Sequence, residues 1–577
     1  MFLPTTSAEV ERLGWSSLDV ILITGDTYID SPFIGAAVIG KVLVNAGFRV
    51  GIIAQPDIDS NRDICRLGEP VLFWGVSGGS VDSMVANYTA NGRRRHQDDL
   101  TPGGENTRRP DRAVIVYTNL IRRHYKNTRP IVLGGIEASL RRLVHYDFWS
   151  NRIRKSILFN AKADLLAYGM GEATMVALAK RLQAGQPAED LPGLCYRTNM
   201  PPPAYLELPA YDEITDNHQA FIDMFHLFYR NQDHLTARGL VQRQDDRYLV
   251  HNPPAPPLTQ QELDQVYSLD FERDIHPFYR QQGKVRALET IQFSLTTHRG
   301  CYGACDFCAI AVHQGQTVHW RSEASLVAEA QQLTKHPRFK GIILDVGGPT
   351  ANMYGFECGK KTTKGVCTDK RCLYPSVCGH LPVQHQSQIR LLKKLRQLPG
   401  IKHVFVASGV RHDLVLADQQ TGILYLEELV KHHVSGQLKV APEHSEPEVL
   451  ALMGKPEIGQ LLTFKDHFDR LTRKAGKKQF LSYYLIAAYP GCTTDHMHQL
   501  HTFTTRHLHI RPEQVQIFTP TPSTYASLMY HTEKNPFTGS NIFVEKNQAG
   551  KIGQKEIITG NRQQQQKSRS AAAQKRH

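Results

Sequence analysis

The sequence predicts an α/β protein in which an amino-terminal doubly wound domain precedes a partial (βα)6 barrel. Over about the first 195 residues, short β-rich runs that end in glycine alternate with helical stretches. From residue 290 the alternation resumes with a longer period and supplies six strand candidates. Because the carboxyl ends of parallel strands meet at one rim, we expect the chemistry of the protein where the strands end.

The doubly wound domain is predicted to occupy residues 1–195. Its first βα unit combines a strand at 18–25, a helix at 35–46 and a second strand at 48–53. A polar insertion at 91–112 interrupts the alternation and is predicted to be a solvated loop. The later strand candidates are 71–75, 130–135 and 164–169.

A mixed, largely helical connector is expected at residues 196–285, between two proline-rich patches and the second unit. The barrel is predicted at 286–525, with a cysteine-rich insertion at 355–380. Residues 526–577 form a basic, glutamine-rich end that is expected to be largely disordered. The barrel strand candidates are 291–297, 341–346, 402–407, 437–441, 480–487 and 513–519.

Composition indicates a globular protein outside the membrane. Hydrophobic residues make up 41% of the 577 and charged residues 21%, which is typical of a folded soluble chain. The sequence has no run of 18 apolar residues, and its first residues do not resemble a secretion signal. We therefore expect a cytoplasmic location and no membrane partner.

The net charge of +13 is a weak argument for nucleic-acid binding. Residues 541–577 hold eight lysines or arginines against two glutamates, so nearly half of the excess belongs to the end of the chain. Arginine pairs and triplets occur at 93–95, 108–109 and 122–123, but no nucleic-acid module or aromatic platform accompanies them. Nucleic acid stays a possible partner, and a solvated basic surface is favoured.

The cysteines carry more information than the charge. Seven of the ten lie between Cys301 and Cys378, which in a large intracellular protein indicates metal binding rather than disulfides. Directly after the first barrel strand, Cys301, Cys305 and Cys308 are spaced to converge, and nearby glycines let the loop wrap closely. Three thiolates fit an iron–sulfur cluster with one iron lacking a protein thiolate, whereas structural zinc prefers four.

This CxxxCxxC pattern, with the aromatic Phe307 before its last cysteine, resembles the radical S-adenosylmethionine (SAM) enzymes. The resemblance extends to YgiQ-type radical SAM proteins over about residues 15–535. It implies a 4Fe-4S cluster on Cys301, Cys305 and Cys308, cleavage of bound SAM to a 5′-deoxyadenosyl radical, and an electron donor such as a flavodoxin or ferredoxin. The substrate is unknown. The stretches that carry the likeness are 50–57, 344–354, 438–444 and 514–522.

The same resemblance predicts further contacts to SAM. Gly347 and Gly348 follow the second barrel strand, where the superfamily carries a Gly-Gly-Glu-like motif, so their backbone is expected to contact the SAM amino group. Pro349 replaces the acidic residue, which leaves only the backbone role, and an ordinary turn is the competing interpretation. By position, Ser408 and Phe307 are further candidates for the cofactor site. Other rim residues are Arg411, Lys439 and Glu443.

A second group of four cysteines lies in the predicted insertion. Its members are Cys358, Cys367, Cys372 and Cys378, in a segment rich in glycine and lysine. Four thiols within 21 residues suit zinc or an auxiliary iron–sulfur cluster, although the tight CxxC pairs of most zinc sites are missing. Reduced free thiols and a redox disulfide remain the alternatives.

The amino-terminal domain is similar to the cobalamin-binding domains that precede some radical SAM barrels. Their motif is DxHxxG, and the corresponding frame here runs from Asp30 to Gly35. Pro32 stands where the histidine would be, and proline cannot ligate cobalt. Cobalamin binding is therefore not favoured over a structural or substrate-recruiting role.

Two functional hypotheses follow. The first is an enzyme that cleaves SAM at the three-cysteine site and acts on an unknown substrate. The second is a non-catalytic iron–sulfur or zinc protein that uses the barrel to bind nucleic acid or protein. No residue of the sequence identifies a catalytic acid or base.

Overall fold

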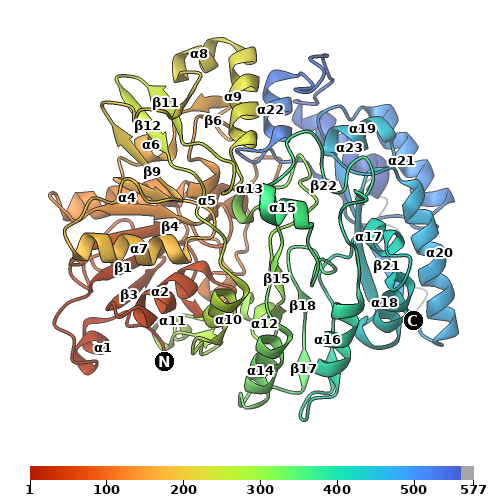
Figure 1. Cartoon of the computed structure of the whole chain (residues 1–577), viewed down its shortest axis with the longest axis horizontal. Helices are drawn as coiled ribbons and strands as arrows, with labels where there is room; N and C mark the ends of the chain where they lie inside the picture. Colours follow the sequence, from red (N-terminus) through yellow and green to blue (C-terminus); the bar gives the residue numbers. More distant parts are fainter. Residues whose placement is uncertain (561–577) are drawn as a thin grey trace.

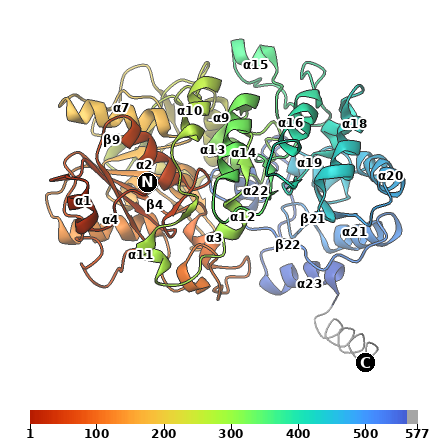
Figure 2. The ribbon, with the colours of Figure 1, turned by 90° about the horizontal axis from the view of Figure 1, so that it is seen from below.

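The structure is a computed structural model that describes residues 1–560. Two α/β halves lie side by side, the amino-terminal half in red to yellow and the carboxyl-terminal half in green to blue (Figure 1). A second view, from below, also separates the two halves, with α23 (Gln548–Thr559) on the blue side (Figure 2). No helix within residues 1–560 is long and apolar enough to cross a bilayer.

The amino-terminal half is built on one nine-stranded sheet. The strands at its centre are parallel. They are continuous apolar runs, because helices cover both faces of a parallel sheet. The first strand lies next to the edge of the sheet, with the following parallel strand outside it and the rest on its other side, which confirms the doubly wound prediction. In spatial order these strands are β3 (Val50–Ala54), β1 (Val20–Thr24), β4 (Phe73–Ser77), β5 (Ile131–Gly134) and β8 (Leu165–Ala167).

Alternate residues of these strands pack against opposite helical layers. Leu22 belongs to the core under α2 (Gly35–Asn45) and α7 (Glu172–Gln183), whereas Ile23 belongs to the core under α4 (Ala113–His124). The alternation is the period of two expected of a strand. Both cores are fully buried, which fixes the sheet as a rigid base for whatever its strand ends carry.

The sheet continues beyond residue 195, the predicted end of the domain. Four strands add to β8, so the predicted connector contributes strands to this sheet as well as helices such as α9 (His218–Arg230). The reason is that successive residues such as Leu249 and Val250 point to opposite faces of the strand and are both buried. These strands are β9 (Leu194–Thr198), β12 (Arg247–His251), β11 (Leu240–Gln244) and β10 (Leu206–Leu208).

The carboxyl-terminal half is an incomplete parallel barrel, as predicted. Six predicted strands appear at their predicted positions, although several are shorter than the apolar runs suggest. Their pairs are parallel, and a bridge between Val410 and Val440 joins the two groups of strands. The barrel strands are β14 (Leu295–Thr296), β17 (Ile342–Ile343), β18 (Val346–Gly347), β19 (His403–Val404), β20 (Gln437–Glu443), β21 (Phe480–Ala487) and β22 (Gln516–Ile517).

Helices between these strands enclose a separate apolar core. Amphipathic helices such as α14 (Glu323–Thr334), α16 (Gln386–Arg396) and α20 (Gly459–Lys474) bury one face against Leu295 and Val440 of the strands. The barrel thus has its own core, and its rim faces the amino-terminal sheet.

The carboxyl-terminal region differs from the predicted disorder over residues 526–560. Helix α22 (Tyr525–Thr532) is almost wholly buried, and Leu528 and Met529 have no exposed surface. Helix α23 is tied to the barrel because the Gln554 Oε1 accepts a hydrogen bond of 2.9 Å from the Ala488 backbone. The prediction of disorder rested on the polar composition of this region and did not recognise the few side chains that are buried against the rest of the protein. The rest of the predicted tail, 561–577, lies outside the described residues.

Candidate functional site

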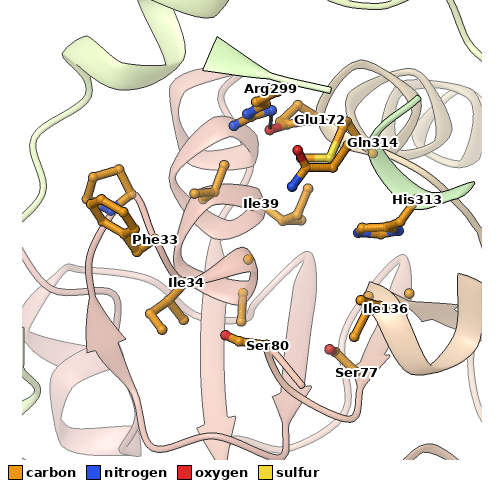
Figure 3. A pocket seen from close by; sticks show the side chains of 18 of the residues that line it. Phe33, Ile34, Ile39, Ser77, Ser80, Ile136, Glu172, Arg299, His313 and Gln314 are labelled. Carbon is orange, nitrogen blue, oxygen red and sulfur yellow. Dashed lines mark hydrogen bonds and ion pairs between the residues drawn. The ribbon is translucent and has the colours of Figure 1, made fainter. Parts of the chain in front are cut away.

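A chamber of about 500 Å³ lies between the two halves of the protein. On one side it is lined by residues at or after the carboxyl ends of β1, β4, β5 and β8, and on the other by the barrel rim. Figure 3 shows side chains of both halves pointing into the same space. The chamber adjoins β1 and β4, where the strand order of the sheet reverses, which is the usual binding position in doubly wound sheets.

The three predicted cluster cysteines lie in a tight loop after β15 (His298–Arg299). Gly300 starts this loop with a φ of +84°, and a Cβ there would lie 2.1 Å from the Thr317 carbonyl oxygen. The loop is held by hydrogen bonds from the Cys301 amide to the Gly315 carbonyl, 3.2 Å, and from the Cys308 amide to the Cys305 carbonyl, 3.0 Å. Only glycine suits its first position.

The thiols of this loop fit an iron–sulfur cluster. Cys301, Cys305 and Cys308 are free thiols, each partly exposed. Burial, together with the neighbouring thiols Cys305 and Cys301, raises the pKa of Cys308 to about 12, so these groups are close enough to repel one another when charged. A bound cationic cluster relieves that repulsion by replacing the protons.

No three His, Cys, Asp or Glu side chains within residues 1–560 converge closely enough to hold a single metal ion. This finding covers Cys301, Cys305 and Cys308 too. In a 4Fe-4S cluster each thiolate binds a different iron, so the ligands surround a cluster rather than one ion.

A buried cation stands beside the thiols. The Arg411 Nη1 lies 3.9 Å from the Cys305 Sγ, and the Arg411 Nε donates a 2.8 Å hydrogen bond to the Asp413 carboxylate. The Thr350 hydroxyl lies 3.8 Å from the Cys301 Sγ. Arg411 thus offsets part of the negative charge of bound thiolates, while Asp413 fixes the guanidinium in place.

Three of the four residues predicted to contact the cofactor line the chamber: Gly347, Gly348 and Ser408. A Cβ on Gly348 would lie 2.7 Å from the ring of His298, so a side chain there would displace that ring. The Ser408 hydroxyl donates a hydrogen bond to the Asp345 carboxylate, which also accepts from the Ser408 amide at 3.1 Å.

Phe307 does not line this chamber. Its ring packs edge-on against Tyr489, with centroids 6.3 Å apart, and contacts an apolar core that includes residues of both halves. Of the other rim candidates, Glu443 is buried in an ion pair of 3.6 Å with Lys455, and Lys439 is half-buried. None of these three side chains lines the chamber.

The sequence did not single out several residues that line the chamber. The Arg299 Nη1 forms a buried ion pair of 2.5 Å with the Glu172 Oε1, across the two halves. The Gln314 Oε1 accepts a 3.1 Å hydrogen bond from the Gly300 amide, which ties a chamber residue to the cysteine loop. His298 and His313 also line the chamber, and burial lowers the pKa of each to about 4.

The second cysteine group is divided between two environments. Cys358 is buried beside Tyr302, with Cys372 packed against the same cluster, and the Cys378 amide donates to the Cys372 carbonyl, 2.8 Å. Cys367 instead lines a larger cavity of about 1080 Å³, which none of the other three lines. The structure does not bring the four thiols together.

The other special residues of the amino-terminal half serve the fold. Asp30 is buried in an ion pair of 3.0 Å with Lys41, and Pro32 lines the chamber without a ligating atom. Arg109, from one of the basic pairs, is buried between Asp26 and Asp98, at 2.9 and 3.1 Å. Its charge is therefore not available to nucleic acid.

Comparison with known proteins agrees with this geometry. The family described as Radical SAM N-terminal matches residues 2–294. A UPF0313 protein of Fusobacterium nucleatum is 55% identical over 562 residues, covering 97% of this chain and 99% of its own. A UPF0313 protein of Thermotoga maritima is 50% identical over 549 residues, covering 95% and 96% respectively.

Among solved structures, the radical SAM methyltransferase TsrM from Kitasatospora setae, with cobalamin and a [4Fe-4S] cluster bound, has a similar fold. The TM-score is 0.50 at 15% identity, and the match covers 94% of this chain and 85% of TsrM. At this identity the likeness concerns the fold alone. The sequence relatives decide the family: the chain belongs to the UPF0313 proteins, within the radical SAM superfamily.

Proposed function

We propose that this protein is a radical SAM enzyme whose Cys301, Cys305 and Cys308 hold a 4Fe-4S cluster. The observation that carries the proposal is the glycine-pinned loop of three free thiols at the rim of an incomplete parallel barrel. When bound, such a cluster supplies the electron that cleaves SAM to a 5′-deoxyadenosyl radical. TsrM, which shares the fold, is described with a [4Fe-4S] cluster bound.

The chain's own residues would bind and orient SAM beside this loop. Gly347 and Gly348 present unshielded backbone to the chamber, and the Ser408 hydroxyl, held by Asp345, lies next to them. Arg411 provides a fixed positive charge at the thiols. Preorganised groups of this kind need no rearrangement during the reaction.

The amino-terminal half would exclude water from the reaction. It covers the barrel rim, so that residues of both halves line the chamber. A radical needs this protection because competing hydrogen donors quench it. The electron would come from outside, from a donor such as a flavodoxin or ferredoxin.

The test is formation of 5′-deoxyadenosine. Anaerobically reconstituted protein with dithionite and SAM should form it, and Cys305→Ala should abolish it because one of the three ligands is lost. Cys65→Ala is the matched control, since Cys65 lies in the amino-terminal half, and it should retain the activity. Cluster assembly without SAM cleavage in the wild-type protein would instead support a non-catalytic iron–sulfur protein.

A further inference from the structure

The chamber between the two halves carries a charge pattern that neither the family nor the fold assigns. Among the described residues that line it, three are acidic and Arg299 is the only lysine or arginine. Arg299 is already paired with Glu172, and both side chains are nearly inaccessible to solvent. The two lining histidines are neutral near pH 7, because burial lowers the pKa of each to about 4. The acidic residues are Asp26, Glu172 and Asp345.

One oxygen of the Glu172 carboxylate accepts no hydrogen bond within the protein. The Glu172 Oε1 binds Arg299, whereas the Glu172 Oε2 is buried and has no hydrogen-bond partner. The residue is 2% exposed, so water does not easily satisfy this oxygen. The Nδ1 of His313, also in the chamber wall, is likewise buried without a partner. Buried polar atoms of this kind are normally satisfied, and a bound ligand is one way to do so.

The rest of the wall is largely apolar. Figure 3 shows Ile34, Ile39 and Ile136 facing the space in which Glu172 and His313 also lie. Most drug-sized ligands bind in apolar pockets of 300–1,000 Å³ with a few polar groups, and about 500 Å³ is within this range. A chamber of this volume suits a small molecule rather than a nucleic-acid strand.

We infer that the sheet side of this chamber binds a small alcohol or amine with an apolar carbon body, which donates a hydrogen bond to the Glu172 Oε2. An anionic ligand would meet carboxylates and no free cation, and burying an unpaired charge is costly. Anionic compounds, phosphorylated ones among them, are therefore disfavoured as occupants. The inference rests on the proposed function in one respect: as the substrate of that reaction, the molecule would lie across the chamber from Gly347 and Gly348.

Three probes with the same apolar body test this class: phenylethanol, phenylethylamine and phenylacetate, which are neutral, cationic and anionic near pH 7. Their binding to the full chain is measured by equilibrium dialysis, without reductant. The alcohol and the amine should bind about tenfold more tightly than the carboxylate. Equal or tighter binding of phenylacetate, or no saturable binding of either other probe, would overturn the inference.

Two variants locate the binding. Glu172→Gln removes the negative charge of the acceptor. It should reduce the preference for the alcohol and the amine over phenylacetate to about threefold or less. Ile39→Trp fills the chamber from helix α2 and should weaken all probes about tenfold, which keeps the test valid if Glu172→Gln folds poorly. Glu207→Gln, exposed on strand β10 and outside the chamber, is the control and should change nothing. Unchanged binding in Ile39→Trp would also overturn the inference.

These results are independent of the SAM reaction. If the protein forms 5′-deoxyadenosine but prefers phenylacetate, the proposed function stands and the inferred ligand class is wrong. If the protein binds the amine and the alcohol but never cleaves SAM, the inferred ligand class stands and the proposed reaction is wrong.

Discussion

Two cysteine-rich loops of the barrel have very different organisation. The loop at 300–308 is short, begins with a glycine that no other residue can replace without a clash, and places its thiols beside a buried arginine. The insertion at 355–380 is longer and divides its cysteines between an apolar cluster and a separate cavity. Cysteine density alone is therefore a poor guide to a metal centre. Backbone constraint and a complementary charge distinguish the first loop from the second.

The largest expected difference concerns iron. Cys308→Ser should lower the iron of reconstituted protein from about four to below one per chain, because a cluster needs all three thiolates of the loop. Cys367→Ser should leave iron unchanged, since Cys367 lies outside the loop whose three thiols are proposed to hold the cluster. Metal analysis with a protein assay measures both. Equal iron loss in the two variants would show that the insertion also binds a cluster.

The buried arginine gives the next effect. Arg411→Gln should destabilise the protein by about 3–5 kcal/mol, because it leaves the Asp413 carboxylate buried without its cation. It should also make the cluster harder to reduce, since a positive charge near Cys305 favours the added electron.

The double variant Arg411→Gln/Asp413→Asn separates these two effects. It removes both charges, so it should recover stability but not the reduction potential. Denaturant unfolding and an anaerobic redox titration provide the two readouts. A potential that recovers together with stability would assign Arg411 a purely structural role.

A glycine pair compares the backbones of the two loops. Gly300→Ala should cost about 2–4 kcal/mol and reduce iron content, because the φ is positive and the new Cβ meets the Thr317 carbonyl. Gly359→Ala, in the insertion, should cost less than about 0.5 kcal/mol, since nothing lies within 4 Å of its Cβ position. Thermal unfolding and iron analysis measure both variants, and equal losses would contradict the comparison.

The smallest effect is expected at Ser408. Ser408→Ala removes a half-buried hydroxyl that donates to Asp345, so it should cost about 1 kcal/mol of stability. It should raise the KM for SAM about threefold, because Asp345 then loses the group that orients it at the chamber wall. Ser445→Ala, outside the chamber, is a suitable control. An unchanged KM would remove Ser408 from the SAM contacts.

Local sequence patterns predicted much of this protein. Apolar runs such as Val20–Thr24 and Phe480–Ala487 were recognisable as strands, and the spacing of Cys301, Cys305 and Cys308 identified the candidate cluster. The pairing of Glu172 with Arg299 was not predictable, because it joins residues 127 positions apart across two halves. The glycines before Glu172 and the position of Arg299 just before the cysteines were the only local signals.

The carboxyl-terminal helices were missed because their residues were predicted to be disordered. Residues 548–559 read as polar and basic, yet Ile558 and Gln554 are buried against the barrel. A few apolar side chains in a polar helix are a weak signal until the partner surface is known. The same reason explains why β10–β12 were not recognised within the mixed, largely helical connector.

The most direct measurement of the central claim is the electron paramagnetic resonance spectrum of the reduced, reconstituted protein with and without SAM. A cluster on Cys301, Cys305 and Cys308 has one iron without a protein thiolate, so SAM should bind there and shift the signal. The shift should be absent in the Gly348→Ala variant if the close packing against His298 shapes the SAM site. A reduced cluster whose spectrum does not change with SAM would contradict a radical SAM function at this loop.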